Sequence, residues 1–369
     1  MKFTCNRDAF YDALQNVTKA ISQRPPFQLL EGVQIITKED VIELTCTDGQ
    51  VFIRSTVPAD IETKGSVVVS GRLFTDMVRR LPDGDVDISM SDKNLITIRG
   101  GGSRTSIMGQ SNTEFPAMKT MFSADNIHLP QRKLKEMISQ VIFAIAVGDV
   151  RQTLNGCFLE LTKDELRLVG LDGFRLSLQQ YNDNFILPND TEKVSCIIPG
   201  KILGEVGHML KDEDDMVTLH IDSTHIMFVI DNTIVVTSLY GGSYINYRAI
   251  LPKEWESRVT VRREDIQGAV ERAGLIARVS KNNIIKLKTE EGKLLITSTS
   301  EIGDFYEEMD AEIDGKPTEI AFNSMFVSDV IKNISEEFTC LYMNGPANPC
   351  IIKPKDKEDY TYLVMSVRM

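Results

Sequence analysis

The sequence has few histidines, the side chains that serve most often as catalytic bases and as metal ligands. It contains four histidines, and none of them lies in an H-E-x-x-H, H-x-x-x-H or C-x-x-H spacing. Nucleotide-binding glycine motifs and the G-x-S-x-G nucleophile motif are also missing. His220 and His225 flank an expected hairpin turn, so we expect both at solvent-exposed strand ends rather than at a metal. The sequence therefore favours a protein without an active site, a metal or another cofactor.

Paired cysteines and long apolar runs are missing too. The six cysteines form no C-x-x-C pair, and most lie in strand-like apolar stretches, so we expect buried free thiols. The longest fully apolar run, Val141 to Val147, is too short to cross a bilayer. The N-terminal segment MKFTCNRDAF becomes polar at once and does not resemble a secretory signal. These features predict a cytoplasmic protein with no membrane association.

The sequence contains a pattern of about 125 residues that occurs three times. The clearest repeated segment (called a phrase below) is an expected strand, a turn residue and a helix. Its copies are VVVSGRLFTDMVRRL from Val67, CIIPGKILGEVGHML from Cys196 and IAFNSMFVSDVIKNI from Ile320. A period of this length exceeds that of solenoid repeats and indicates three domains of one fold. We predict domains at residues 1–122, 123–252 and 253–369.

Two further phrases repeat in the same order. Helical apolar stripes, with steps of four and three residues, follow Phe3, Ile127 and Val259. The Asp-Gly turn of TDGQVFIRSTV returns in LDGFRLSLQQY 124 residues later, and the third copy has lost it. Three phrases in one order make a chance match improbable.

The segments between the helices are rich in strands. Apolar, β-branched runs such as VIELTCT, LITIRG, HIMFVI and TIVVTSL are separated by Asp-Gly, Asp-Asn and Glu-Gly, which is the chemistry of hairpin turns. Each third is therefore expected to hold about two helices and eight strands. This pattern predicts an α+β fold, with helices on one side of antiparallel sheets.

The charge is unevenly distributed between helices and the rest of the chain. The formal net charge is −12, which alone argues against a nucleic-acid partner. The six predicted helical windows together sum to +8, which leaves −20 for the remaining residues. Exposed helix faces often contain Lys and Arg, so the pattern has an ordinary explanation. The alternative is a positive surface that faces a polyanion.

Eight segments along the whole chain share their order and spacing with one known family. They are the opening MKFT, Arg24-Pro25, RRLPDGDVDI from Arg79, GDVRQTLNGCFLE from Gly148, LDGFRLS from Leu171, YRAILP from Tyr247, AFN from Ala321 and YLVMSVRM from Tyr362. On these segments, the chain resembles the bacterial sliding clamps, the beta subunit of DNA polymerase III. The resemblance implies a non-catalytic processivity factor that closes around duplex DNA as a head-to-tail homodimer ring, with helices inside and antiparallel sheets outside.

The resemblance also implies two surfaces that close the ring and contact DNA without reading its sequence. The implied DNA-binding residues are Arg24, Arg72, Arg79 and Lys201, to which the helix charges add Arg80, Arg132 and Lys135. The implied dimer interface places Arg104, Ile107 and Met108 against Leu275 and Ile276, with the acidic residues Glu301 and Asp304 beside them. For the basic and the acidic residues, a solvated surface without a partner is the alternative interpretation.

The third implied site is an apolar pocket for short linear peptides. The partners implied are the clamp loader subunits, the alpha subunit of the replicative DNA polymerase, repair polymerases, ligase and mismatch-repair proteins. The implied pocket residues are Leu154, Leu171, Gly173, Phe174, Arg175, Leu176, Ile245, Tyr247, Ile250, Asn323, Phe326, Ala347, Pro349, Leu363, Met365, Val367 and Arg368.

This chain departs from the family pattern within that pocket. The family commonly has Thr and His where this chain has Leu171 and Phe174, and Pro where Ile245 stands. The pocket should therefore be more apolar than is usual, and its peptide preference should differ. Some of its residues, such as Leu154 and Val367, have a second interpretation as plain domain core. Two rival functions also remain open, an enzyme on a triplicated scaffold and a structural repeat protein with no DNA partner.

Overall fold

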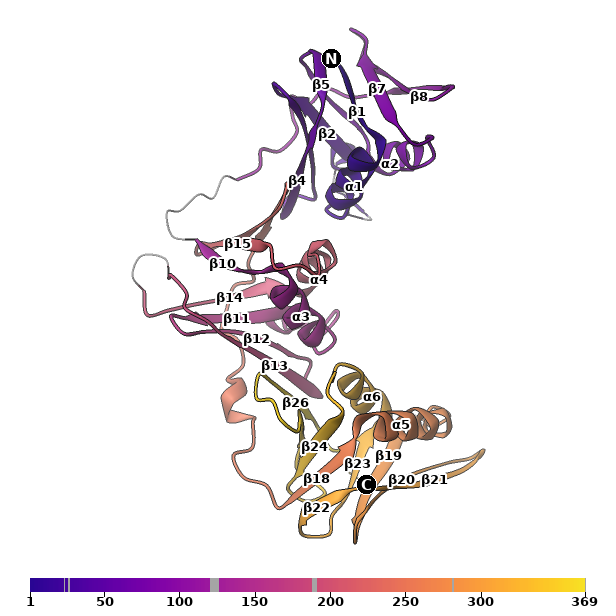
Figure 1. Cartoon of the computed structure of the whole chain (residues 1–369), viewed down its shortest axis with the longest axis vertical. Coiled ribbons are helices and arrows are strands. Elements are labelled where there is room, and N and C mark those ends of the chain that lie inside the picture. Colours follow the sequence, from indigo (N-terminus) through magenta and orange to yellow (C-terminus); the bar gives the residue numbers. More distant parts are fainter. Residues whose placement is uncertain (23, 26, 120–125, 188–190, 281, 369) are drawn as a thin grey trace. The chain divides into compact units, whose positions relative to one another are not determined.

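The computed structural model describes residues 1–22, 24–25, 27–119, 126–187, 191–280 and 282–368. Within these ranges the chain forms six α-helices and 26 strands, so the predicted α+β fold is confirmed (Figure 1). The helices are α1 Arg7–Thr18, α2 Gly71–Arg79, α3 Gln131–Ile142, α4 Gly200–Met209, α5 Arg263–Ala277 and α6 Ser324–Lys332.

The repeated phrases correspond to repeated structure. In each of the three copies of the clearest phrase, a strand runs directly into a helix, which gives the pairs β6–α2, β14–α4 and β23–α6. Asn6 and Asn323 stand immediately before α1 and α6, where each side chain accepts hydrogen bonds from free backbone N–H groups of the first helical turn. Figure 1 shows α1 beside α2, and α5 beside α6, on the sheets that they cover.

The strands form four sheets, whose pairings are all antiparallel. The first sheet has the order β5 Asp60–Thr63, β1 Lys2–Asn6, β7 Asp85–Met90, β8 Leu95–Gly100, β9 Ser103–Met108. The second has the order β10 Ile127–Pro130, β15 Met216–Ile221, β16 His225–Ile230, β17 Thr233–Ser238, β4 Val51–Pro58, β3 Val41–Thr47, β2 Gly32–Thr37, β6 Ser66–Ser70.

The other two sheets lie in the later part of the chain. The third sheet has the order β14 Lys193–Pro199, β11 Gly156–Thr162, β12 Glu165–Leu171, β13 Arg175–Asn182, β26 Tyr360–Val364, β25 Cys350–Pro354, β24 Phe338–Met343, β18 Ser257–Arg262, β22 Glu312–Gly315. The fourth has the order β21 Gly303–Asp310, β20 Lys293–Ser300, β19 Ile284–Glu290, β23 Glu319–Asn323.

Two of these sheets extend across the sequence repeats. We call the β4–β17 pair, in the second sheet, the first junction, and the β13–β26 pair, in the third sheet, the second junction. Because hydrogen-bonded strands cross the repeats, the chain divides into two compact units rather than three. Unit one is residues 1–135, 186–191 and 201–239, and unit two is the remainder. The domain boundaries proposed from the sequence stay a prediction, and the one near residue 122 lies outside the described residues.

Aromatic packing and hydrogen bonds within turns stabilise these elements. In unit one, Phe10 of α1 packs edge-to-face on Phe3 and on Phe74. The repeated Asp-Gly turns are built alike, because the carboxylates of Asp48 and Asp172 each accept two backbone N–H bonds within their own turn. The glycine that follows each aspartate has a φ near +90°, a conformation that other residues rarely adopt.

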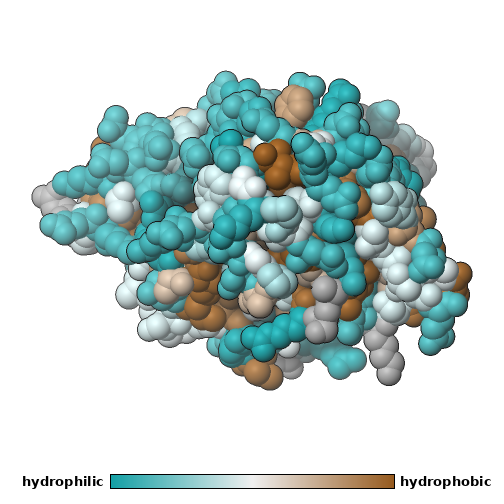
Figure 2. All heavy atoms as spheres, turned by 90° about the horizontal axis from the view of Figure 1, so that it is seen from below, coloured by the Kyte–Doolittle hydropathy of each residue, from teal (hydrophilic) through white to brown (hydrophobic). Residues whose placement is uncertain are grey.

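The cysteines are unpaired and mostly buried. All six thiols are free, and five are buried, as expected; burial raises the pKa of Cys5 to about 12. No helix among the described residues is long and apolar enough to cross a membrane. The face in Figure 2 is largely hydrophilic, and its hydrophobic residues gather in separate small patches.

Candidate functional site

The second junction is built around a continuous apolar row on one face of the sheet. Leu176 of β13 lies between Leu171 of β12 and Leu363 of β26, and Leu363 pairs in turn with Ile351 of β25. These four residues are almost completely buried. They belong to one core cluster: Leu154, Val169, Leu171, Leu176, Leu178, Tyr247, Ile351 and Leu363.

The segment that links β17 to β18 covers this row. Tyr247, in the short 3-10 helix Tyr247–Ala249, is 2% exposed, and Ile250 packs against the same cluster. Tyr244 stacks on Phe158, with ring centroids 5.0 Å apart and the rings nearly parallel. Residues 240–252 therefore form a lid over the sheet, which we call the covering linker.

A buried carboxylate fastens the covering linker to the sheet. The Glu160 side chain is 5% exposed, and it forms ion pairs with Arg248 of the linker and with Lys193 of β14. Arg167 lies 3.7 Å from the same carboxylate. Burial raises the pKa of Glu160, but the hydrogen bonds from Arg248 and Lys193 outweigh burial and hold the pKa below its ordinary value. Glu160 is thus charged in the folded protein and holds the linker in place.

The C-terminal segment joins this junction through its backbone. The Met365 N–H donates to the Phe174 carbonyl at 2.8 Å, and the Val367 N–H donates to the Ala321 carbonyl at 2.8 Å. Phe174, at the tip of the Asp-Gly turn, is 59% exposed and stacks on Phe326 of α6, with ring centroids 5.5 Å apart. We name Phe174, Phe326 and Met365 the C-terminal patch. It presents the Phe174 ring, part of the Phe326 ring and the Met365 side chain to solvent.

Arg175 is occupied by neighbours of its own chain. Its guanidinium forms ion pairs with Asp172, at 3.0 Å, and with Asp329. It also lies over the rings of Phe143 and Phe326, 5.3 and 4.9 Å from their centroids. Arg175 therefore orients Phe326 and the Asp-Gly turn. Asp329 was missed in the sequence, although it stands one helical turn after Phe326, on the same face of α6.

The residues expected to line the peptide pocket divide into a buried floor and an accessible rim. Leu154 is fully buried, as the plain-core interpretation requires. Asn323 caps α6, which gives it a structural task of its own. The buried residues are Leu154, Leu171, Leu176, Tyr247 and Leu363; the half-buried residues are Arg175, Ile250, Asn323, Phe326, Pro349 and Val367; the exposed residues are Gly173, Phe174, Ile245, Ala347, Met365 and Arg368.

Of the basic residues expected to contact DNA, Lys135 is half-buried and the others are exposed, but they differ in their partners. Arg79 of α2 pairs with Asp76 at 3.0 Å, and Arg132 of α3 pairs with Asp214 at 2.7 Å. No carboxylate of the described chain forms an ion pair with Arg24, Arg72, Arg80 or Lys201. The helix charge is therefore partly neutralised, and these last four cations are available to an anion.

The residues expected at the dimer interface lie on two sheet edges, on α5 and in the turn before β21. Among the described residues, strand β9 is hydrogen-bonded to β8 alone, and it exposes Arg104 and Met108 while Ile107 is half-buried. Strand β21 pairs, within the same described residues, with β20 alone, and Asp304 is exposed on it. On α5, Leu275 is exposed and Ile276 half-buried, and Glu301 is exposed in the turn before β21. Open edges with exposed apolar residues are characteristic of surfaces that pair with another chain.

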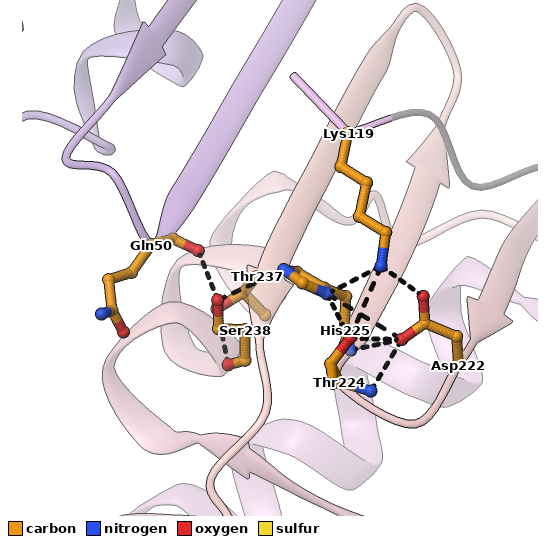
Figure 3. Close-up of polar contacts among 7 residues, drawn as sticks. All are labelled: Gln50, Lys119, Asp222, Thr224, His225, Thr237 and Ser238. Atoms are coloured by element: carbon orange, nitrogen blue, oxygen red, sulfur yellow. Dashed lines mark hydrogen bonds and ion pairs between the residues drawn. The ribbon is translucent and has the colours of Figure 1, made fainter. Parts of the chain in front are cut away.

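One group in unit one has the residue types of a hydrolase triad. His225 lies 3.4 Å from the Ser238 hydroxyl through Nε2 and 3.9 Å from the Asp222 carboxylate through Nδ1 (Figure 3). The Lys119 ammonium, which can only donate, is 3.1 Å from Nδ1. Nδ1 must therefore accept, so Nε2 carries the proton and cannot remove one from Ser238. The group is a set of polar contacts rather than a catalytic site.

The same group corrects one expectation from the sequence. His225 is half-buried and hydrogen-bonded, and His220 is buried, so neither is the solvent-exposed strand end that we expected. Burial lowers the pKa of His220, with a further contribution from His128. Both side chains belong to the packing of the second sheet.

Known proteins resemble this chain in sequence and architecture over its whole length. The chain matches the family descriptions "DNA polymerase III beta subunit, N-terminal domain" over residues 1–119, "central domain" over 128–246 and "C-terminal domain" over 248–368. It is 31% identical to the beta sliding clamp of Staphylococcus epidermidis, covering 100% of this chain and 99% of the relative. The crystal structure of the DNA polymerase sliding clamp from Bacillus subtilis is 28% identical, with a TM-score of 0.95 and coverage of 100% and 99%. A putative DNA polymerase III beta subunit from Eubacterium rectale is 29% identical, with a TM-score of 0.94 and full coverage of both chains.

Proposed function

The chain belongs to the DNA polymerase III beta subunit family, the beta sliding clamps, and we propose which of its residues perform the three tasks of such a clamp. The protein is a DNA sliding clamp. It is a non-catalytic processivity factor that works as a homodimer ring on DNA and tethers DNA polymerase III. Tethering, ring closure and DNA contact each belong to a separate surface of this chain.

The C-terminal patch is the surface that takes partner peptides. The observation that supports this assignment most strongly is the stack of the exposed Phe174 ring on the half-buried Phe326 ring, beside Met365, whose backbone is hydrogen-bonded to Phe174. Exposed aromatic residues on a rigid support lose little conformational freedom on binding, so they serve well as anchors for a peptide. The unbranched methionine adapts its shape to different side chains. The partners assigned to this patch are the polymerase alpha subunit, clamp loader subunits, repair polymerases, ligase and mismatch-repair proteins.

Peptide binding by single-residue variants tests this assignment. We expect Phe174→Ala to weaken binding of a polymerase alpha-subunit peptide about 30-fold, because burial of one large anchor is worth about 2 kcal/mol. Met216→Ala, which removes a similarly exposed side chain from β15 in unit one, is the matched control and should leave the affinity unchanged. Fluorescence anisotropy measures both. Equal affinities for the wild type and Phe174→Ala would exclude the patch.

The unpaired cations are the main DNA contacts. Arg24, Arg72, Arg80 and Lys201 are exposed and have no ion-pair partner among the described residues, whereas Arg79 already has Asp76. Contacts of this kind hold phosphates and release counterions, so they carry no sequence preference. Removing one such cation should reduce the slope of log K against log salt by about 1, and removing Arg79 should reduce it less. Measurement of binding to linear duplex over a salt series separates these outcomes.

The two unpaired strand edges close the ring. Pairing of β9 in one copy with β21 in the next would continue the sheet and cover Ile107, Met108 and Leu275, while Arg104 meets the acidic residues of the β20–β21 hairpin. Met108→Asp should therefore give monomers in analytical ultracentrifugation. A dimer that persists in this variant would place the interface elsewhere.

Two further assignments belong to this proposal. The chain has the three domains predicted from its repeats. Its location is the cytoplasm, because the bacterial chromosome is replicated there.

A further inference from the structure

The guanidinium of Arg175 borders the C-terminal patch and is mostly enclosed by its own chain. The Arg175 side chain is only 13% exposed, and its Cζ lies 4.9 Å from the centroid of the Phe326 ring and 5.3 Å from that of the Phe143 ring. All three residues belong to unit two. A cation that is poorly screened by solvent is a strong recognition point for a carboxylate of a bound peptide, provided that it is free.

Two carboxylates of the same chain already occupy this guanidinium. Asp172 accepts from Nε of Arg175 at 3.0 Å, and Asp329 accepts from Nη1. No other acceptor among the described residues is hydrogen-bonded to the Arg175 side chain. The three side chains together have one positive and two negative charges, so their net charge is −1. The group as a whole therefore does not attract an anion.

The two carboxylates differ in what else they do. Asp172 is mostly buried and also accepts the backbone N–H groups of Phe174 and Arg175, so it is part of the Asp-Gly turn. The Asp329 side chain is 41% exposed, and within the described ranges its carboxylate is hydrogen-bonded to Arg175 alone. Asp329 also lies in the last turn of α6, where a negative charge opposes the helix dipole. The fold therefore does not need the Asp329 carboxylate for its helix or for the turn.

Asp329 is the charged group that stands beside the aromatic rings of the patch. It follows Phe326 by three residues on α6, so the two side chains lie on the same face of the helix. The Phe326 ring stacks in turn on Phe174, with ring centroids 5.5 Å apart. Because Asp329 is the more exposed partner of its ion pair, a peptide bound on these rings meets its carboxylate rather than the guanidinium of Arg175.

We propose that Asp329 is a specificity-determining residue of the peptide site, an inference that rests on the proposed function of the C-terminal patch. By neutralising Arg175, Asp329 excludes partners whose acidic side chain would lie beside Phe326, and the site accepts peptides with an uncharged or basic residue at that position. A carboxylate placed there gains no uncompensated cation and is repelled by Asp329. Such selection arises from a repulsive element as well as from attractive contacts.

Pairs of peptides that differ by one charge test this inference. The probe is the clamp-binding peptide of the polymerase alpha subunit, prepared with either Glu or Gln at each position outside its apolar anchors and measured by fluorescence anisotropy. At one position, the ratio of Glu-peptide to Gln-peptide affinity should be 1 or less for the wild type and should rise about tenfold in Asp329→Ala at low salt, because Arg175 then donates to the peptide carboxylate. High salt should reduce this gain.

The ratio separates specificity from a loss of structure. A disordered patch would weaken both peptides of a pair and leave their ratio unchanged, whereas Asp172 still compensates Arg175 in the Asp329→Ala variant. Glu271→Ala is the control for net charge, because it removes a similarly exposed carboxylate that pairs with Lys332 of α6. It should leave every ratio as in the wild type. Asp329→Ala combined with Arg175→Met should lose the gain.

The other outcomes distinguish this inference from its premise. Ratios that stay unchanged in Asp329→Ala at every position, while both peptides still depend on Phe174, would overturn the role of Asp329 and leave the patch intact. A gain that appears equally in Glu271→Ala, or that persists in the double variant without Arg175, would assign the effect to other charges and overturn it too. If Phe174→Ala leaves the affinity of the Gln peptide unchanged, the patch is not the peptide site and the inference fails with it.

Discussion

The two junctions solve one structural problem in different ways. Both join neighbouring repeats through a pair of antiparallel strands, and both have a segment of the adjoining linker lying over the sheet. At the first junction, the apolar cluster has only two buried members, Met227 and Val236, with Met118 and three other half-buried side chains around them. At the second, eight residues are buried and six more pack on them.

The polar contacts are distributed in the opposite sense. At the first junction, Ser55 and Thr233 share a buried hydrogen bond of 2.8 Å between facing strands, and Lys119, Asp222 and His225 fasten the linker. At the second junction, one buried carboxylate, Glu160, fastens the linker from beneath. The difference indicates a division of labour. The first junction is held largely by directional polar contacts, whereas the second is held by its larger apolar cluster.

Truncation of one linker side chain at each junction should show the largest difference in stability loss between the two junctions. We expect Tyr247→Ala to destabilise unit two by about 3 kcal/mol, because it removes a buried aromatic from a large cluster that cannot collapse. Met118→Ala should cost about 1 kcal/mol, since Met118 is only half-buried beside a small cluster. Urea unfolding followed by Trp255 fluorescence reports unit two, and hydrogen exchange of β17 amides reports unit one. Equal losses would mean that the two junctions do not differ in their dependence on apolar burial.

The next largest difference in stability is expected between the two carboxylates that hold the linkers, Glu160 of β11 and Asp222 after β15. Glu160→Gln should cost about 2 kcal/mol, less than for a fully buried pair because Arg248 and Lys193 are each about half exposed. Asp222→Asn should cost about 0.5 kcal/mol, because the amide still accepts the backbone bonds of its turn and only the exposed pair with Lys119 is lost. Urea midpoints at neutral pH measure both. A larger loss at Asp222 would contradict the contrast.

Acidification gives a second measurement on the same pair. Burial raises the pKa of Asp222, but hydrogen bonds from Lys119 and from the Thr224 and His225 backbone outweigh it, so the folded-state pKa is lowered, as it is for Glu160. A lowered folded-state pKa means that each carboxylate stabilises the fold fully above its ordinary value, 3.8 for Asp222 and 4.5 for Glu160, and less as the pH falls through the folded-state value. The wild type should therefore lose stability below about pH 4.5 more steeply than Glu160→Gln.

The sequence could predict what is local in these junctions. Periodicity placed the helices and strands of all three repeats, and the Asp-Gly signal located the turns at Asp48 and Asp172, because such turns are closed by hydrogen bonds within a few residues. Resemblance to a family supplied the list that contains Phe174 and Met365. Their stacking and backbone contacts arise from the packed structure.

What the sequence could not predict depends on contacts between distant residues. Ser55 and Thr233 are 178 positions apart, and nothing in either segment indicates the other. Arg175 was expected to be available to a ligand, but Asp329, 154 positions away, occupies it. The expectation for His225 was wrong for the same reason, since Lys119 and Ser238 reach it from other elements. Local patterns determine where an element begins and ends. Which distant side chains come into contact depends on how strands of different repeats pair in one sheet.

The buried hydroxyl pair tests whether the first junction depends on matched polar groups. We expect Ser55→Ala to cost about 1.5 kcal/mol, because it leaves the buried Thr233 hydroxyl with only the longer contact to Asn232, at 3.4 Å. Ser55→Ala combined with Thr233→Val should cost roughly 0.5 kcal/mol or less, because no polar group is then left unsatisfied. Urea unfolding of the single and double variants gives the coupling energy. Additive losses would show that the hydrogen bond contributes little to this junction.

The smallest expected effect on stability is that of removing the Lys119 ammonium, which contacts Asp222 and His225. Lys119 and Asp222 are each more than a third exposed, so Lys119→Met should cost about 0.5 kcal/mol at low salt and still less at high salt. Yet the ammonium also holds His225 in the tautomer that donates to Ser238, and it ties residues 112–118 to the β15–β16 hairpin. We therefore expect hydrogen exchange of amides in residues 112–118 to become faster in Lys119→Met while the urea midpoint hardly moves. Lys2→Met, which breaks a somewhat more exposed pair with Glu62 elsewhere in unit one, is the control and should leave that exchange unchanged. If exchange is unaltered in both, the first junction is held by its strands and its small apolar cluster, and the polar contacts over the linker do not distinguish it from the second.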